Sequence, residues 1–226
     1  MRTTVVASII LLGTTVSAAW AQPGTGERPA NARPTRPPLF LREAWQQISG
    51  GGENPVTPAS LTGPNVEMTL YGPSSDEIQL TGAAGNEGNP VHVWTGLCTT
   101  ACGITLRDRT RLVDLTGLAR IRWNTKTSGF HQIRPLIRLA DGTLLAGDHT
   151  DASTLDWLTS EFSLAGVRWL VVDPERLVTT GNFVADPDLS RVDEVGFVDL
   201  MPASGHGPGG WSDVGLIEVY GKPVKR

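Results

Sequence analysis

Short runs of alternating apolar and polar residues, broken by loops rich in glycine and proline, follow one another from Leu39 to the end of the chain. Residues 66–71 alternate with a period of two, as a strand with one buried face does. Residues 195–198 and 216–220 are two further apolar runs of strand length, separated by a loop with several glycines. The sequence shows no long helical period and no internal repeat. It therefore predicts an all-β domain.

The alternation also assigns side chains to faces in residues 119–126. One face holds Ile121, Trp123 and Thr125, and the other holds Arg122, Asn124 and Lys126. A hydrophobic core requires the first set inside, so the second set is predicted to face water or a ligand.

Residues 133–149 contain the clearest hairpin signal in the chain. Asp-Gly at 141–142, between two apolar runs, is the preferred two-residue type I′ turn. With that turn, Arg138 lies opposite Leu145 and Arg134 lies opposite His149. The three polar side chains then share one face, and the other face holds Ile137, Leu139, Leu144 and Ala146.

The two cysteines, Cys98 and Cys102, lie between the apolar runs 91–97 and 103–107, which look like the arms of a hairpin. In an oxidising compartment they are expected to form a disulfide. A loop this short stabilises the fold by about 2 kcal/mol at most, so the bridge mainly fixes local geometry. A redox pair or half of a metal site is the alternative, which the spacing and the lack of further cysteines disfavour.

The chain begins with the three parts of a secretory signal peptide. Arg2 is the positive start, residues 5–12 are the apolar core, and residues 19–21 are the small-residue cleavage site. The apolar run is too short to span a membrane comfortably. The following residues, rich in proline, predict an extended linker. We therefore expect a signal peptide at 1–21, a linker at 22–38 and the all-β domain at 39–226, in a bacterial protein that is secreted or periplasmic.

The charge balance argues against two classes of partner. The chain has 19 basic and 23 acidic residues, and the expected signal peptide and linker remove four arginines but only one glutamate. The remaining domain is acidic, which disfavours a nucleic-acid backbone or an anionic membrane as the main partner. We expect no nucleic acid and, after signal cleavage, no membrane insertion.

Three stretches together resemble galactose-binding-like β-sandwiches, the jelly rolls of many carbohydrate-binding modules. In residues 189–221 a Leu-Ser turn, an apolar strand, a glycine loop and an acidic residue precede a closing strand. Asp-Leu-Thr-Gly at 114–117 leads into the alternating strand, and residues 157–164 run from tryptophan through phenylalanine to leucine. The resemblance covers about half of the domain. It implies a jelly-roll β-sandwich of two antiparallel sheets.

The resemblance also raises the question of a structural calcium ion. In such sandwiches an acidic residue of the first strand and another near the last strand often share a cation. Glu43 and Asp213 occupy matching places here, with Glu218 as a substitute for Asp213. Calcium needs six or more oxygen ligands, so carbonyl groups from residues 205–210 would have to complete the shell. The favoured alternative is an ion pair between Arg42 and Glu218.

The outward-facing polar residues predict a binding surface. If the strand at 119–126 and the hairpin at 133–149 are neighbours, they form one basic surface on an acidic domain. Guanidinium groups suit the hydroxyl pairs and carboxylates of sugars, and uronic acids in particular. Aromatic rings at loop edges suit stacking, whereas the other tryptophans of the domain, Trp45, Trp123, Trp157 and Trp169, are expected in the core. The predicted ligand-binding residues are Arg122, Asn124, Lys126, Arg134, Arg138, His149, Asp199, Trp94 and Trp211.

The sequence favours binding over catalysis. It contains no Gly-x-Ser-x-Gly, His-Glu-x-x-His or phosphate-binding glycine loop. A carboxylate pair for glycoside cleavage cannot be chosen, because the separation of the two groups decides the mechanism. We expect a secreted carbohydrate-binding domain whose ligand is a sugar or polysaccharide, with an acidic sugar as one option. A sugar-active hydrolase or lyase on the same sandwich and an assembly or structural protein are the alternatives, because a fold does not fix a function.

Overall fold

The computed structural model describes residues 35–47, 54–154, 156–201 and 210–226. They all belong to one compact unit, Pro34–Arg226. The expected signal peptide and most of the expected linker lie outside the described residues. At the end of the linker Pro37 is buried, and the Pro38 carbonyl accepts a hydrogen bond from the Gly221 amide at 3.1 Å.

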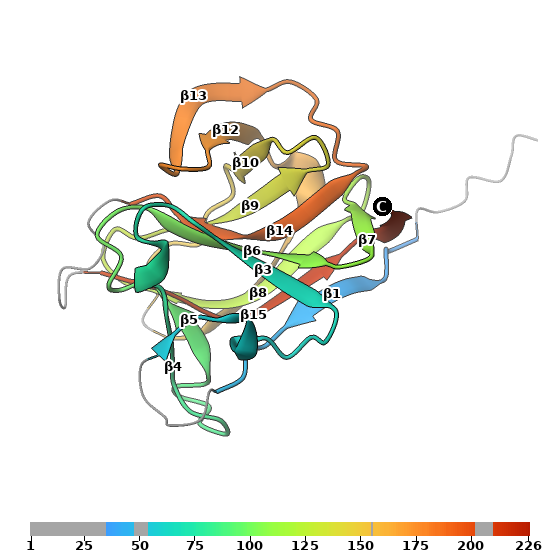
Figure 1. The fold of residues 1–226 in the computed structure, drawn as a ribbon. Helices are drawn as coiled ribbons and strands as arrows, with labels where there is room; N and C mark the ends of the chain where they lie inside the picture. Colours follow the sequence, from blue (N-terminus) through green and yellow to red (C-terminus); the bar gives the residue numbers. More distant parts are fainter. Residues whose placement is uncertain (1–34, 48–53, 155, 202–209) are drawn as a thin grey trace, which may run out of the picture. The chain divides into compact units, whose positions relative to one another are not determined.

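The described residues form two antiparallel sheets, so the predicted all-β sandwich is confirmed (Figure 1). Three short 3-10 turns, Pro58–Ser60, Ser75–Glu77 and Leu164–Gly166, are the helical elements of the described part. None of its helices is long and apolar enough to cross a membrane.

The first sheet, called sheet A, has the strand order β11-β8-β15-β5-β4-β2, and β1 pairs with the C-terminal half of β15. Its strands are β1 (Leu39–Glu43), β2 (Asn54–Pro55), β4 (Gln79–Thr81), β5 (His92–Trp94), β8 (Arg120–Thr127), β11 (Leu158–Ser163) and β15 (Ser212–Tyr220).

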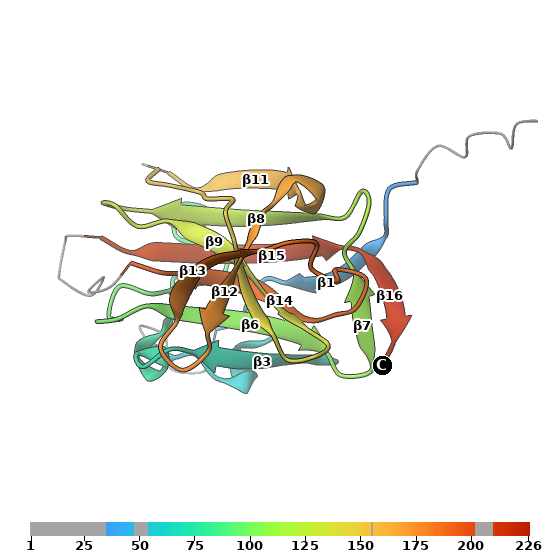
Figure 2. The same cartoon turned by 90° about the horizontal axis from the view of Figure 1, so that it is seen from above.

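The second sheet, called sheet B, has the order β13-β12-β10-β9-β14-β6-β3, and β7 pairs with both β14 and β16. Its strands are β3 (Val66–Tyr71), β6 (Cys102–Asp108), β7 (Arg111–Asp114), β9 (Ile133–Leu139), β10 (Leu144–Gly147), β12 (Trp169–Asp173), β13 (Val178–Val184), β14 (Val192–Asp199) and β16 (Lys222–Lys225). Figure 2 shows β7 and β16 side by side where the chain ends.

The main hydrophobic core lies between the sheets and takes side chains from both. On β8, Ile121, Trp123 and Thr125 are buried, whereas Arg122, Asn124 and Lys126 lie on the outer face of sheet A. The alternation predicted for this strand is therefore confirmed.

The register between β9 and β10 is shifted by one residue from the predicted hairpin. Leu144 lies opposite Arg138, and Leu145 lies opposite Ile137. The loop has three residues rather than two, because the Leu139 amide donates to the Thr143 carbonyl at 2.9 Å and Gly142 takes a left-handed φ of 92°. A three-residue loop that ends in a left-handed glycine is the next most common hairpin solution.

The shifted register separates the four residues that were expected on one apolar face. Ile137 and Leu139 lie in the main core, whereas Leu144 and Ala146 point to the outer face of sheet B. That outer face holds a second hydrophobic cluster, called the outer cluster, so β9 and β10 are buried on both sides. Its buried members are Tyr71, Ala101, Leu136, Leu144, Ala146, Val172, Leu177 and Val198.

The disulfide between Cys98 and Cys102 is present, as predicted. The predicted hairpin around it is wrong, because β5 belongs to sheet A and β6 to sheet B. The bridge therefore fixes a connection that crosses from one sheet to the other.

One further expectation is corrected. Trp45 and Trp169 are buried as expected, whereas Trp157 is only half-buried and packs against His92, with ring centroids 5.0 Å apart.

Candidate functional site

The predicted single basic surface does not exist, because its residues belong to different sheets. Arg122, Asn124 and Lys126 lie on the outer face of sheet A, and Arg134 and Arg138 lie on β9 of sheet B. The chain crosses between the sheets in the loop after β8, so consecutive strands are not neighbours. Sequence alternation assigns faces within a strand, and it does not say which sheet the strand joins.

His149 and Arg138 also lie apart from the other predicted residues. The His149 ring stacks on Phe162 with centroids 3.7 Å apart, and its Nε2 is 3.3 Å from Oδ1 of Asp151. Arg138 reaches the buried Glu194, with Nη1 3.5 Å from Oε1. Both side chains therefore make contacts within the protein and do not form part of the predicted basic surface.

The proposed calcium pair is wrong in its geometry. Glu43 lies opposite Ile217 on the core side of sheet A, whereas Asp213 lies opposite Trp94 on its outer side. Glu43 also accepts hydrogen bonds from the amides of Ala44, Trp45, Thr62 and Gly63 and from the Thr62 hydroxyl. Donors thus surround its carboxylate where a cation would have to bind. The alternative ion pair is present, with Arg42 Nε 3.2 Å from Glu218 Oε1.

Among the described residues, no group of three or more histidine, cysteine, aspartate or glutamate side chains is placed to hold a metal ion.

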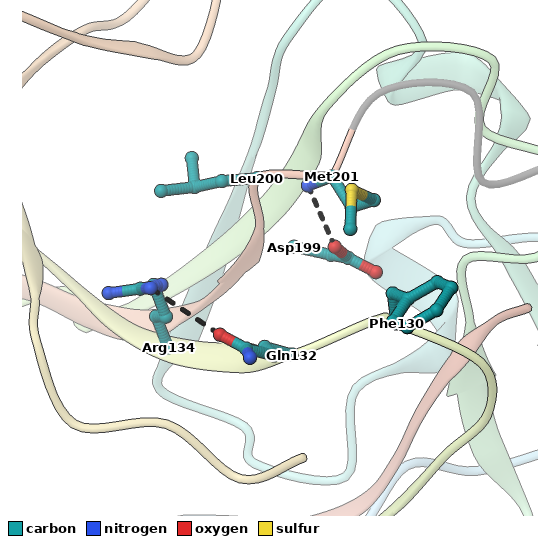
Figure 3. Close-up of a pocket in the computed structure, with 6 residues that line it drawn as sticks. All are labelled: Phe130, Gln132, Arg134, Asp199, Leu200 and Met201. Carbon is teal, nitrogen blue, oxygen red and sulfur yellow. Dashed lines mark hydrogen bonds between the residues drawn. The ribbon is translucent and has the colours of Figure 1, made fainter. Parts of the chain in front are cut away.

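Two of the predicted ligand-binding residues, Arg134 and Asp199, do come together in a pocket of about 220 Å³ at one end of sheet B (Figure 3). The loop between β8 and β9 supplies Phe130 and Gln132, β9 supplies Arg134, and the end of β14 with the next two residues supplies the rest. The lining residues are Phe130, Gln132, Arg134, Asp199, Leu200 and Met201. We call this the end pocket.

Asp199 forms the inner wall of the end pocket, and its buried carboxylate accepts three hydrogen bonds from within the protein. Its side chain is 2% exposed. Oδ2 accepts from His131 Nδ1 at 2.7 Å and from the Ser212 hydroxyl at 2.8 Å, and Oδ1 accepts from the Met201 amide at 3.0 Å. The prediction that Asp199 accepts from sugar hydroxyls is therefore corrected. Asp199 instead holds together the loop before β9, the end of β14 and the start of β15.

Arg134 and Phe130 are the groups that the end pocket offers to a ligand. The contacts of the Arg134 guanidinium are long and go to neutral oxygens, the Gly147 carbonyl at 3.5 Å and Gln132 Oε1 at 3.4 Å. It forms no ion pair with any residue in the described part of the chain. The Phe130 ring is 87% exposed at the tip of its loop. Figure 3 shows the ring and the guanidinium on opposite sides, with Gln132 and Asp199 between them.

The outer face of sheet A gathers the other predicted aromatic residues, in an arrangement that we call the tryptophan face. Asp213 lies between Trp94 on β5 and Lys126 on β8. Trp211 Nε1 donates to Asp213 Oδ2 at 3.1 Å, and Trp157 covers His92 from the side. The three tryptophans are half-buried.

Burial controls the protonation of the two polar groups under these rings. It raises the pKa of Asp213 to about 7, although Trp211 and Lys126 act in the opposite direction. It also lowers the pKa of His92, whose ring is buried beside the same carboxyl group. Both shifts favour the uncharged form of each side chain.

Sequence reasoning missed Phe130, Gln132, His131 and His92. Phe130 and Gln132 lie in the short loop 128–132, where an aromatic residue after Ser-Gly is exposed by the turn itself, and this signal was available. The role of His131 depends on Asp199, 68 residues later in the chain. No local pattern indicates such a contact.

No protein-family model and no curated protein matches this chain. Among solved structures, the chain is similar in fold to carbohydrate-binding modules. A family 29 module determined with cellulohexaose is 12% identical, with a TM-score of 0.44, over 83% of this chain and 94% of that one. The family 11 module of a cellulosomal cellulase from Clostridium thermocellum is 14% identical, with a TM-score of 0.41, over 82% and 94%.

Proposed function

We propose that the chain binds carbohydrate in the end pocket and that Arg134 selects an acidic sugar there. The observation that carries the proposal is that the Arg134 guanidinium, which has no ion pair within the described residues, lies in the same pocket as the exposed Phe130 ring. A sugar ring presents an apolar face to an aromatic ring, and its carboxylate or hydroxyl pair fits the planar guanidinium fork. The Gln132 amide adds a donor and an acceptor between them.

The end pocket supports binding rather than glycoside cleavage. Cleavage by the usual route needs two carboxyl groups on opposite sides of the scissile bond. Among the described residues that line the pocket, Asp199 is the one carboxylate. Its Oδ2 is hydrogen-bonded to His131 and Ser212 and faces the protein interior. Export of the chain, which its first residues suggest, would place the pocket in contact with extracellular or periplasmic glycans.

Titration calorimetry with two matched sugars, galacturonate trimer and galactose trimer, tests the proposal after a glycan array has been screened. The acidic trimer is expected to bind more tightly, because only its carboxylate can pair with Arg134. Arg134→Gln should remove that preference, with a loss of about 1–3 kcal/mol for the acidic trimer. Phe130→Ala should weaken both trimers.

Arg176→Gln is the matched control, because Arg176 lies in the turn between β12 and β13 and does not line the end pocket. Absence of binding to every glycan on the array would refute carbohydrate binding. Equal binding of both trimers by the native chain would refute only the selection by Arg134.

A further inference from the structure

We propose that the end pocket is regulated by pH, through one proton that Asp213 and His92 share beneath the tryptophan face. This inference rests on the proposed function for its ligand, but the shared proton itself follows from the hydrogen bonds of the two side chains. Neither residue lines the end pocket.

The hydrogen bonds of His92 show where its first proton lies. Its Nδ1 is 2.6 Å from the Pro90 carbonyl oxygen, which can only accept. Nδ1 must therefore carry a proton and donate it to Pro90. In the neutral imidazole this leaves Nε2 as an acceptor.

Asp213 brings a second acceptor to the same place. Its Oδ2 accepts from Trp211 Nε1. Its Oδ1 is buried, has no hydrogen-bond partner among the described residues and lies 3.5 Å from His92 Nε2. A carboxylate oxygen and an imidazole lone pair repel each other in a buried place unless one of them holds a proton. One proton therefore belongs to the pair, either on Oδ1 or on Nε2.

The surrounding charges do not replace this proton. Lys126 on β8 is the charged group that acts on both members of the pair, and its positive charge favours proton loss from each. Trp157 covers His92, and the half-buried Trp94 and Trp211 flank Asp213. With the pKa of Asp213 raised to about 7 by burial, the proton leaves the pair as the pH rises above neutral.

Three consecutive residues connect this proton to the end pocket. Asp213 faces the tryptophan face, and Ser212, which points the opposite way on β15, donates to Asp199 in the pocket wall at 2.8 Å. The Trp211 carbonyl accepts from the Ser128 amide at 2.9 Å, in the loop that carries Phe130. A shift of the first residues of β15 therefore moves both the inner wall of the pocket and its aromatic ring.

The direction of the effect follows from burial. At pH 6 the proton is present and the first residues of β15 are held in place. At pH 8.5 a buried carboxylate faces the His92 lone pair, so this end of β15 loosens and the pocket loses its shape. Affinity for the galacturonate trimer is expected to fall by about fivefold or more between these pH values, the scale of ordinary coupling between sites. Carboxylates and guanidinium groups of ordinary pKa do not titrate in this interval.

Two variants separate this effect from other causes. Asp213→Asn keeps the acceptor for Trp211 and supplies a permanent N–H towards His92, so its affinity should stay at the native pH 6 value from pH 6 to 8.5. Asp148→Asn removes a carboxylate that pairs with Arg168 at 2.7 Å, on sheet B, and should keep the native pH dependence. His131, beside Asp199, is intact in both variants. A pH dependence that persists in Asp213→Asn would arise from a group other than this pair and would overturn the proposal.

The proton can be measured without any sugar. Carbon NMR of the Asp213 carboxyl group and nitrogen NMR of the His92 ring, from pH 4 to 10, should show one titration near neutral pH at this pair and a protonated Nδ1 throughout. No change in either group over that range would overturn the proposal, even if the trimer binds. If no glycan binds, the proposed function fails, and the NMR titration still decides whether the pair holds the proton.

Discussion

On the outer face of each sheet a tyrosine and an arginine contact the same glutamate, but the burial of the tyrosine differs between the two sheets. On sheet B, the Tyr71 hydroxyl donates to Glu194 Oε2 at 2.6 Å, and Arg138 reaches the other carboxylate oxygen. On sheet A, the Tyr220 hydroxyl donates to Glu218 Oε2 at 2.9 Å, and Arg42 and Arg122 pair with the same carboxylate. Both glutamates are buried, but Tyr71 is buried with its glutamate and Tyr220 is not.

The difference comes from what covers each face. The turn after β12 places Leu177 over sheet B, where it is buried in the outer cluster with Tyr71 and Leu136. Its Cδ1 lies 2.9 Å from the point that a Cβ on Gly72 would occupy, so the turn packs directly on the chain beside Tyr71. Within the described ranges, the outer face of sheet A carries half-buried tryptophans but no comparable cluster of buried apolar side chains. The tyrosine of the trio is therefore buried on sheet B and only half-buried on sheet A, whereas the glutamate is buried on both sheets.

The largest expected effect is on stability, when the outer cluster is opened. Leu136→Ala should destabilise the fold by about 2–5 kcal/mol, the usual cost of a cavity in a core, because Leu136 is fully buried. Leu216→Ala, on the half-covered outer face of sheet A, should cost about 1 kcal/mol. Urea unfolding of the two variants measures both. Equal losses would mean that the outer cluster is not a second core.

A smaller difference is expected between the two tyrosines. Tyr71→Phe should lower the free energy of unfolding by about 1–3 kcal/mol, because it removes one of the two hydroxyl groups that donate to Oε2 of the buried Glu194. The Thr105 hydroxyl is the other. Tyr220→Phe should cost about 0.5 kcal/mol or less, as for most surface substitutions. Thermal unfolding at neutral pH compares them, and a larger loss for Tyr220→Phe would contradict the enclosed environment of Tyr71.

The same pair of tyrosines predicts a difference at high pH. Burial, together with the hydrogen bond to Glu194, raises the pKa of Tyr71 to about 12, above its ordinary value near 10. A folded-state pKa raised in this way means that stability is lost as the pH rises from about 10 to about 12. Tyr71→Phe should remove this part of the alkaline loss, and Tyr220→Phe should leave it. Unfolding curves between pH 9 and 12 would test this, and identical alkaline losses in the native chain and in Tyr71→Phe would refute it.

The smallest effect is expected from the exposed cation on sheet A. Arg42→Ala should change stability by less than about 1 kcal/mol, because the Arg42 side chain is 54% exposed and its ion pair with Glu218 is screened by solvent. The change should shrink further at high salt. Calorimetric unfolding at low and high salt measures the change. A loss of stability as large as that of Leu136→Ala would show that this outer face is shielded from solvent as sheet B is.

Much of the fold could be predicted from local pattern. The alternation in β8 placed Trp123 in the core and Lys126 outside, and both positions are confirmed. The disulfide followed from two cysteines four residues apart. The candidate site was less accessible, because only Arg134 and Asp199 of the nine predicted ligand-binding residues line the end pocket. Phe130 had a local signal, whereas the bonds of Asp199 to His131 and Ser212 join three separate segments.

The sequence by itself determined the class of the fold, the strands with one buried face and the cysteine bridge, because each depends on residues close together in the chain. The tertiary structure decided which sheet each strand joined, the register at Gly142 and the closing of the outer face of sheet B over Glu194. A strand alternates in the same way in either sheet, and an apolar run such as β9 has no side that local pattern could mark as outer. These features depend on contacts between distant segments, and so they appear only when the whole chain has folded.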